Sequence, residues 1–597
     1  MSKLPVKILT PVGMMGYGYE VDKVYKGIQL GASAIIIDAG STDSGPQKLA
    51  LNEGTCPHEA HVRDFAHVLD AIFHHKLKLI ITSAGGDGSN YHVDEFVKIV
   101  DDYCLEKGYS LKLGKIYANV PKDIVRKALK KRVVTPCGAV PELTQGEIDL
   151  AVQIVAQMGH EPLVDLMEKH PDYDIIISGR TYDPSGYAAY CINQGITNWG
   201  TAYHMGKVME CGAQCSWPKS KEALATIWDD RFDILPLQTF SKCSPQSLAA
   251  HSLYENPNTE LHYGPGGVLD LKPSSYKTTG PRSAGATGAL FHKTPYSVKL
   301  EGAKVGGNRS IWMGSFRDPV LISQIDDFQV RLKEHLYAKF PQHKFEVVTK
   351  AYGKDGTMGP LETDTSVAKE IFLLGEVMHE DQITATQIAN VGRVFCVHAP
   401  YKGQVSTTGN YAMPLTNLEI PLGRTCSFNI YHLLPVDDPL SLFPSSVQTV
   451  GPNQSTATRN PKFGFDLIQP DPEATSTYTN GVAPEAESNV KLVRGQTPVT
   501  KIAKDIRSKN AGPYEITFDI IFNDLAAYNF AKGSPKLTAE YLAPLWRSSP
   551  KDVIGCQFSE PARAFKFTLP RPWGAGGFGE RDLHCSQQHV PLLNLVL

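Results

Sequence analysis

The stretch AIIIDAGSTD (34–43) decides the fold, because an apolar run of strand length ends there in a loop of small and polar residues. Amphipathic segments of helix length separate such runs, and this alternation is typical of βαβ units with a parallel sheet. We therefore predict an α/β fold whose residues 1–240 form a Rossmann-like, doubly wound domain with a mostly parallel sheet. The same run-and-loop pattern recurs at VKILT (6–10), LKLIITS (77–83), LKLGKIYA (111–118) and DIIIS (174–178).

Beyond residue 240 the composition changes. Residues 241–452 are rich in Gly, Pro and Thr with scattered strand-like segments, which predicts a second, α+β domain with more antiparallel pairing. Residues 453–495 are rich in Pro, Ser, Thr and Asn and predict a linker. Residues 496–597 recover periodic structure and predict a small C-terminal α+β domain.

Three segments carry local predictions. In PELTQGEIDLAVQIVAQMG (141–159), Thr144 followed by Glu147 resembles a capping box at a helix start. RVFCVHA (393–399) is strand-like, and KIAKDIRS (501–508) is helical in pattern.

Composition excludes several classes of function. With 59 basic against 62 acidic residues, no global field recruits nucleic acid or anionic lipid. We find neither a signal-peptide pattern nor the run of ~20 apolar residues that a membrane span needs. The 11 Cys are scattered singly without CxxC pairs, so we expect them to be reduced thiols. We expect a cytoplasmic protein that binds a small molecule, contacts neither nucleic acid nor membrane, and forms a homo-oligomer.

Ligands of such sheets bind at the carboxyl ends of the strands, so the loops after the runs are the candidate site. The first loop spaces its glycines as GxxGxG rather than GxGxxG, and no GxxxxGK[ST] occurs, which disfavours NAD and Walker-type ATP binding. Gly16 and Gly18 are substrate-binding candidates, because glycine lets backbone N–H groups approach an anion. A tight strand-to-helix turn is the equal alternative.

Two acidic loops follow neighbouring strands. Carboxylates at strand ends serve as general bases, Mg²⁺ ligands or hydroxyl acceptors, whereas Asp also initiates turns. We predict a catalytic role for Asp43, and Mg²⁺ held by Asp43 and Asp87 stays an open alternative; no other cofactor or metal is predicted. The substrate-binding candidates here are Ser41, Thr42, Gly86, Asp87 and Gly88.

The loop GRTYD (179–183) offers Arg180, whose planar fork suits a carboxylate or phosphate, with Asp183 to orient it. The alternative is an internal Arg–Asp pair that shapes the loop. We predict an anion-binding site formed by both residues.

The segment HMGKVMECGAQC (204–215) contributes Glu210 as a general acid or base for α-proton removal. Cys211 packs behind it or, as a weaker alternative, acts as a nucleophile. The spacing of His204 and Cys215 does not match a zinc motif. HEAH (58–61) and HSLYE (251–255) are expected to be surface or capping residues.

In the C-terminal part, Lys509 lies in a dense group of polar residues just before AGP (511–513). These residues either complete a catalytic site across an interface or dock the domain. We keep Lys509 as a catalytic candidate.

Taken together, GRTYDPSGYA (179–188), HMGKVMECGAQC and TSAGGDGS (82–89) resemble the acyclic terpene utilisation family, called AtuA-like. DIRSKNAGPYEITFDIIF (505–522) and CSQQHVPLL (585–593) resemble the small domain of unknown function that accompanies that family. The family takes its name from gene clusters that degrade citronellol and geraniol through acyl-coenzyme A intermediates. The resemblance implies an enzyme of branched carboxylic acid or acyl-CoA metabolism.

Two hypotheses follow. The first is a lyase, most plausibly a hydratase or dehydratase, that acts on a branched carboxylic acid or its acyl-CoA thioester. The second is a non-catalytic binding or assembly subunit for a partner carboxylase or CoA-transferase.

Overall fold

The computed structural model describes residues 5–405, 408–469 and 490–597. Its largest sheet has ten strands within these residues, and the centre is parallel, in the order β1-β2-β3-β7-β4. Ile80 lies opposite both Ile36 and Ile176, and the strands are buried because helices cover both faces. These five strands are β1 (Val6–Thr10), β2 (Ala34–Asp38), β3 (Lys78–Thr82), β4 (Leu111–Ile116) and β7 (Ile175–Ser178).

Antiparallel strands extend this sheet on both sides, so the sheet is mixed rather than mostly parallel. The parallel centre predicted from the five apolar runs is confirmed, and the flanks were not predicted. Beside β1 the flanking strands are β8 (Ala223–Ile227), β9 (Arg231–Pro236), β13 (Ala284–Thr287) and β12 (Ser275–Thr278), and beside β4 it is β19 (Ser445–Val450).

Helices pack on the two faces in separate hydrophobic cores. One core is formed with α1 (Val21–Gln29), α3 (His58–His75) and α4 (Asn90–Lys107). The other is formed with α5 (Lys122–Lys130), α6 (Gln145–Leu150), α7 (Glu161–Lys169), α8 (Ser185–Asn193) and α9 (Trp199–Met209).

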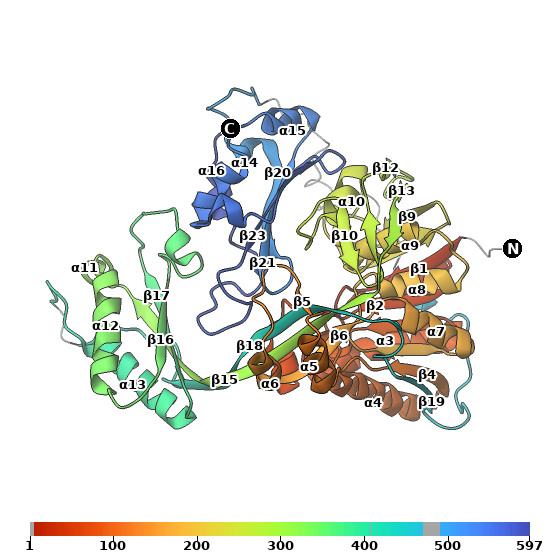
Figure 1. Cartoon of the computed structure of the whole chain (residues 1–597), viewed down its shortest axis with the longest axis horizontal. Helices are drawn as coiled ribbons and strands as arrows, with labels where there is room; N and C mark the ends of the chain where they lie inside the picture. Colours follow the sequence, from red (N-terminus) through yellow and green to blue (C-terminus); the bar gives the residue numbers. More distant parts are fainter. Residues whose placement is uncertain (1–4, 406–407, 470–489) are drawn as a thin grey trace.

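A second sheet has the order β16-β17-β15-β18-β5, with β6 also paired to β15. Its long strands β15 and β18 run from the body of the molecule to an outlying lobe (Figure 1). The strands are β15 (Ser297–Phe316), β18 (Ile420–Pro435), β16 (Glu346–Tyr352), β17 (Ile371–His379), β5 (Thr135–Pro136) and β6 (Ala151–Gln157). The lobe helices are α11 (Pro319–Ile322), α12 (Ile325–Lys339) and α13 (Gln382–His398).

Smaller elements lie near the candidate site. They are the helix α2 (Gln47–Leu51), the helix α10 (Pro245–Ser252) and the three-stranded sheet of β10 (Leu261–Gly264), β11 (Gly267–Asp270) and β14 (Leu290–Lys293).

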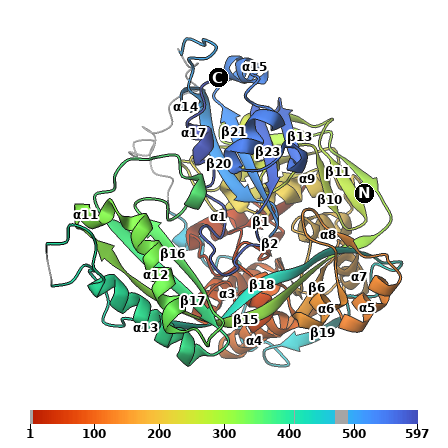
Figure 2. The same cartoon turned by 60° about the vertical axis from the view of Figure 1, so that its left-hand side comes forward.

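The C-terminal part forms its own antiparallel sheet, β20-β21-β23-β22, which stands above the ends of β1 and β2 (Figure 2). It also contacts the lobe, where Lys350 Nζ donates to the Glu580 carbonyl at 2.6 Å. The strands are β20 (Ala503–Asn510), β21 (Glu515–Phe522), β22 (Gly555–Ser559) and β23 (Ala564–Pro570), with helices α14 (Val499–Ile502), α15 (Leu525–Lys532), α16 (Ala539–Leu542) and α17 (Val590–Leu593).

Two local predictions were wrong, and the predicted capping box was confirmed only in its N-cap residue, Thr144. Thr144 caps α6 by accepting from the Glu147 N–H, but the helix ends at Leu150 and residues 151–157 form strand β6. RVFCVHA lies in α13, and most of KIAKDIRS is strand β20. In each case pairing or packing with a distant segment decided the outcome, which local pattern does not report.

The domain boundaries at residues 240, 452 and 495 stay predictions, although β19, from residues 445–450, joins the first sheet. Part of the predicted linker, residues 470–489, lies outside the described residues. Among the residues that the structure describes, no helix combines the length and apolarity needed to cross a membrane.

The tight approach of two site loops generates a stability prediction. Gly88 has φ +63°, and a Cβ there would lie 2.0 Å from the Arg180 backbone nitrogen. Gly195 also has positive φ, +94°, but a Cβ there would meet nothing within 4 Å. We expect Gly88→Ala to lower the melting temperature clearly more than Gly195→Ala, which bears only the left-handed strain of about 1–2 kcal/mol. Equal melting temperatures for the two variants would show that the loops do not approach closely.

Candidate active site

The loops after β1, β2 and β7 line two adjoining cavities, of about 460 and about 290 Å³. The larger cavity also takes residues from β10, β15, β18 and the C-terminal domain, and the smaller one takes residues from α10 and the C-terminal domain. The two cavities therefore adjoin at the carboxyl ends of the parallel strands, which is where the run-and-loop pattern predicts a ligand site. Their shared lining is Gly40, Ser41, Asp43, Asp183 and Glu255.

Asp43 is contacted by two residues of the C-terminal domain, Lys509 and Asn510. The Lys509 ammonium contacts Asp43 Oδ2 and lies 3.1 Å from Glu255 Oε1. Asn510 Nδ2 donates to Asp43 Oδ1 at 2.7 Å, and Arg571 Nη1 donates to Asn510 Oδ1 at 2.5 Å. The C-terminal domain thus contributes side chains to the cavities in addition to docking.

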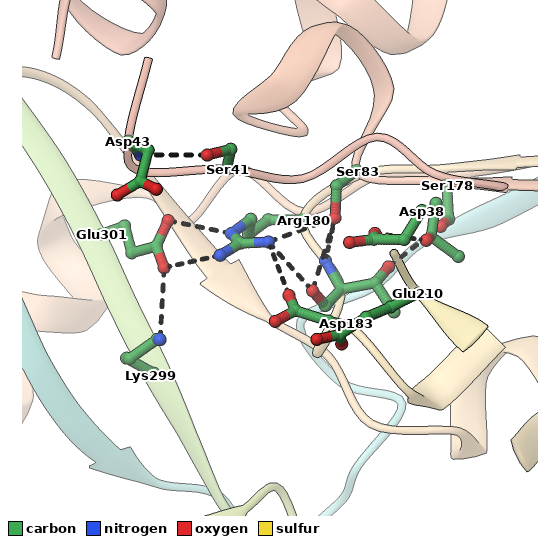
Figure 3. Close-up of polar contacts among 12 residues, drawn as sticks. Asp38, Ser41, Asp43, Ser83, Ser178, Arg180, Asp183, Glu210, Lys299 and Glu301 are labelled. Carbon is green, nitrogen blue, oxygen red and sulfur yellow. Dashed lines mark hydrogen bonds and ion pairs between the residues drawn. The ribbon is translucent and has the colours of Figure 1, made fainter. Parts of the chain in front are cut away.

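Arg180 lies in the wall of the larger cavity, but its charge is already met within the protein (Figure 3). Its Nε and Nη2 donate to Glu301 at 2.9 and 3.2 Å, and Nη1 lies 3.5 Å from Asp183 Oδ1. Although burial alone would raise it, Arg180 and Lys299 hold the pKa of Glu301 below its ordinary value. The internal-pair alternative therefore describes Arg180 better than the anion clamp, with Glu301 as its main partner.

Glu210 lies just after α9, in the smaller cavity, and its Oε1 contacts the Lys207 ammonium. Burial raises the pKa of Glu210 to about 8, against the opposing effect of Lys207. Its Oε2 is buried without a hydrogen-bond partner among the described atoms. Burial, with Glu210 beside it, also raises the pKa of Cys211 well above the ordinary thiol value, which disfavours its role as a nucleophile.

Two further carboxyls have a pKa near neutrality. Burial raises the pKa of Glu255 to about 7, with Lys207 opposing the shift. Burial likewise raises the pKa of Glu515 to about 7; this β21 side chain lines the larger cavity and accepts from the Ala139 N–H at 3.1 Å. Burial lowers the pKa of Lys509 to about 8. Groups that titrate close to pH 7 are suited to general acid–base chemistry.

The glycine loop does not hold an open anion site. The N–H groups of Gly16 and Gly18 donate to Asp64 Oδ2 at 2.8 and 3.0 Å, so the anion that they bind is the protein's own carboxylate. The tight-turn alternative fits this geometry, and substrate binding by the two glycines stays a prediction.

The loop after β3 is also structural. Asp87 Oδ1 pairs with His92 Nδ1 at 2.7 Å, and the Gly88 carbonyl accepts from the Arg180 N–H. Gly86 accepts from the Ser41 N–H and has no room for a Cβ, which would lie 2.1 Å from Thr55 Oγ1. In the loop before it, Ser41 and Thr42 line the larger cavity, and their role in substrate binding stays a prediction.

Asp43 and Asp87 have separate partners, so the geometry does not favour the alternative of a shared Mg²⁺. Among the described residues, no group of three or more His, Cys, Asp or Glu side chains is arranged to hold a metal ion.

Sequence reasoning missed several residues of the site. His251 and Glu255, from HSLYE, both line the smaller cavity. His251 is buried, so its assignment to the surface was wrong, whereas the Glu255 side chain is 33% exposed. In HEAH, His58 is exposed, as expected, whereas His61 is buried. The lining of the larger cavity also includes Lys207, Lys299 and Glu515. Lys207 lies in helix α9 and the other two lie in strands β15 and β21, and no sequence motif marks any of the three.

The fold and the two cavities together define an α/β protein whose candidate site is completed by a C-terminal α+β region. Residues 47–224 match the model of the acyclic terpene utilisation family protein AtuA, and residues 499–596 match a domain of unknown function, DUF4387. Two separate regions of the chain are thus similar to the two families that the sequence motifs resemble, which confirms the predicted resemblance. No curated protein and no solved structure matches the chain.

The Arg180–Glu301 pair predicts a large cost for removing one partner. Glu301→Gln leaves a buried guanidinium without its counter-ion, and we expect a loss of about 3–5 kcal/mol in unfolding free energy. The double variant Arg180→Met/Glu301→Leu, which removes both charges, should recover much of this loss in denaturant unfolding. A Glu301→Gln protein as stable as the parent would restore Arg180 as an available anion clamp.

Glu515 predicts a pH dependence of stability. Its pKa is about 7 in the fold against an ordinary 4.5, so the folded state keeps a proton that the unfolded state releases between these values. The unfolding free energy therefore loses this contribution as pH rises through that window. Compared with the parent, Glu515→Gln should be relatively more stable at about pH 8 than at about pH 5, because the amide never ionises. A constant difference in melting temperature across pH would contradict the assignment.

Proposed function

We propose that this chain is a carbon–oxygen lyase, a hydratase or dehydratase, that acts on a branched carboxylic acid or its acyl-CoA thioester. Similarity to the AtuA family points to catabolism of the kind for which that family is named. The observation that carries the proposal is the contact of Lys509 with Asp43 and Glu255 at the junction of the two cavities.

Elimination of water needs a base for the α-proton and an acid for the departing hydroxide. Glu255 and Glu210 both line the smaller cavity, and their pKa values of about 7 and about 8 leave the first ionised and the second protonated between those values. We assign Glu255 as the base and Glu210 as the acid. Lys509 polarises the substrate carbonyl, and Asp43 holds Lys509 in place.

The substrate carboxylate or thioester needs a cationic partner in the larger cavity. Lys207 and Lys299 line this cavity. Burial alone would lower the pKa of each ammonium, but Glu210 raises the pKa of Lys207. Tyr431 and Glu301 likewise raise the pKa of Lys299. Both lysines stay protonated at neutral pH. Arg180, which is bound to Glu301, stabilises this wall and does not serve as the clamp.

The test follows α-proton exchange by NMR in D₂O with a panel of short and branched 2-oxo acids, branched 3-hydroxy acids, their alkenoic counterparts and the CoA esters. We expect exchange by the parent, and a fall of about 100-fold or more in Glu255→Gln. Lys98→Met, at a side chain that is 71% exposed and paired with Asp102, is the matched control and should exchange at the parent rate. The exchange rate should rise through about pH 7 and fall above about pH 8.

If the parent protein binds members of the panel but does not exchange their α-protons, the lyase proposal is contradicted. That outcome would favour the second hypothesis, a non-catalytic binding or assembly subunit.

A further inference from the structure

We propose that Lys509 forms an imine with the carbonyl carbon of a short 2-oxo acid. The inference deepens the proposed lyase function and rests on it for the elimination step, because it names the substrate class and the covalent device that activates it.

The position of Lys509 is the first support. Its side chain is 12% exposed and lies in the smaller cavity, between two carboxylates that belong to two other segments of the chain. A lysine on an outer surface samples many rotamers, whereas this amine is held by Asp43 and Glu255 at one place in the cavity wall. A fixed amine in the wall of a cavity is the arrangement that carbonyl addition requires.

Proton transfer is the second support. A lysine attacks a carbonyl only as the neutral amine, and burial brings the pKa of Lys509 to about 8, near the value of about 7 for Glu255. The ammonium can therefore pass its proton to Glu255 at small cost.

The step balances without an oxidant or a reductant. The neutral Lys509 nitrogen forms a bond to the carbonyl carbon, the carbon–oxygen π bond breaks, and the oxygen takes a proton from the added nitrogen to give a carbinolamine. The protonated Glu255 then gives its proton to that hydroxyl, the carbon–oxygen bond breaks, and water leaves. The products are the protonated imine and the Glu255 carboxylate.

The smaller cavity also has cations for the carboxylate of a 2-oxo acid. Lys221 Nζ donates only to backbone carbonyls, those of Tyr17 at 3.2 Å and Gly18 at 2.9 Å, within the described residues. Lys219 makes no ion pair or side-chain hydrogen bond in the part of the chain that the structure describes, and it lines the same cavity. Neither ammonium is neutralised by a carboxylate of the protein.

Two orphaned polar atoms complete the pocket. Glu210 Oε2 and His251 Nε2 are buried, have no hydrogen-bond partner among the described atoms, and belong to residues that line the smaller cavity. Burial keeps His251 neutral by lowering its pKa well below the ordinary value. Together they suit a neutral hydroxyl, such as the one that leaves after the imine has acidified the adjacent carbon. The volume, about 290 Å³, suits a short acid.

Lys48 provides an internal comparison. Burial lowers its pKa to about 8 as well, but its ammonium donates to the Ser41 carbonyl and Ser44 Oγ, and it lines neither cavity. If a lowered pKa were sufficient, both lysines would react. Because only Lys509 lines a cavity, we expect reaction at Lys509 and not at Lys48.

The experiment incubates the full chain with pyruvate, glyoxylate or 3-methyl-2-oxobutanoate and sodium cyanoborohydride, which reduces imines to stable amines. Intact mass and peptide mapping then locate the adduct. We expect one adduct per chain at Lys509, none at Lys48, loss of the adduct in Lys509→Arg, and about tenfold slower trapping in Glu255→Gln. Lys98→Met should label as the parent does. Melting temperatures confirm that each variant is folded, and Lys509→Arg keeps the charge that pairs with Asp43.

Trapping at Lys509 no faster than at exposed lysines, with all three acids, would overturn the imine. An adduct at Lys509 without α-proton exchange would retain the imine and reject the lyase, whereas exchange without an adduct would retain the lyase and reject the imine. The two proposals therefore fail separately.

Discussion

The buried ion pair between Arg180 and Glu301 is the interaction on which the rest of the site depends. Arg180 follows a strand of the parallel sheet, and Glu301 lies on the long strand β15 of the second sheet. A guanidinium at this depth is tolerated only with a counter-ion and satisfied donors, so the pair fixes the two sheets against each other. Gly40 makes this possible, because a Cβ there would lie 2.4 Å from Arg180 Nη1.

The C-terminal domain contributes further side chains to the lining of the same site. Lys509 and Asn510 end strand β20, Glu515 begins strand β21, and all three line one of the cavities. Behind them Arg571 pairs with Glu580 at 2.7 Å. The fused domain is therefore part of the candidate chemistry, because the groups that meet Asp43 come from it.

Electrostatics and burial act together at this junction. Carboxyls such as Glu210 and Glu255 lie deep enough for burial to raise their pKa, while lysines between them limit the shift. Such an arrangement costs folding free energy, since buried charges are stabilised only by their partners. It places proton donors and acceptors near neutrality, where they are useful in catalysis.

The sequence by itself determined the parallel centre of the sheet and the edge at which the site lies. Residues 35–37 and 175–177 are consecutive isoleucines, a pattern typical of strands that are covered on both faces. The loop residues Ser41, Thr42, Asp43 and Asp183 come shortly after these runs, at the carboxyl ends of the strands. Only the tertiary structure decided that residues 503–510 form a strand, that Arg180 is paired with Glu301, and that Gly16 and Gly18 bind Asp64. It also decided that Glu255 and Lys509, 254 positions apart, share one contact. The physical reason is that hydrophobic periodicity is local along the chain, whereas strand partners, buried counter-ions and pKa values depend on groups brought together by folding.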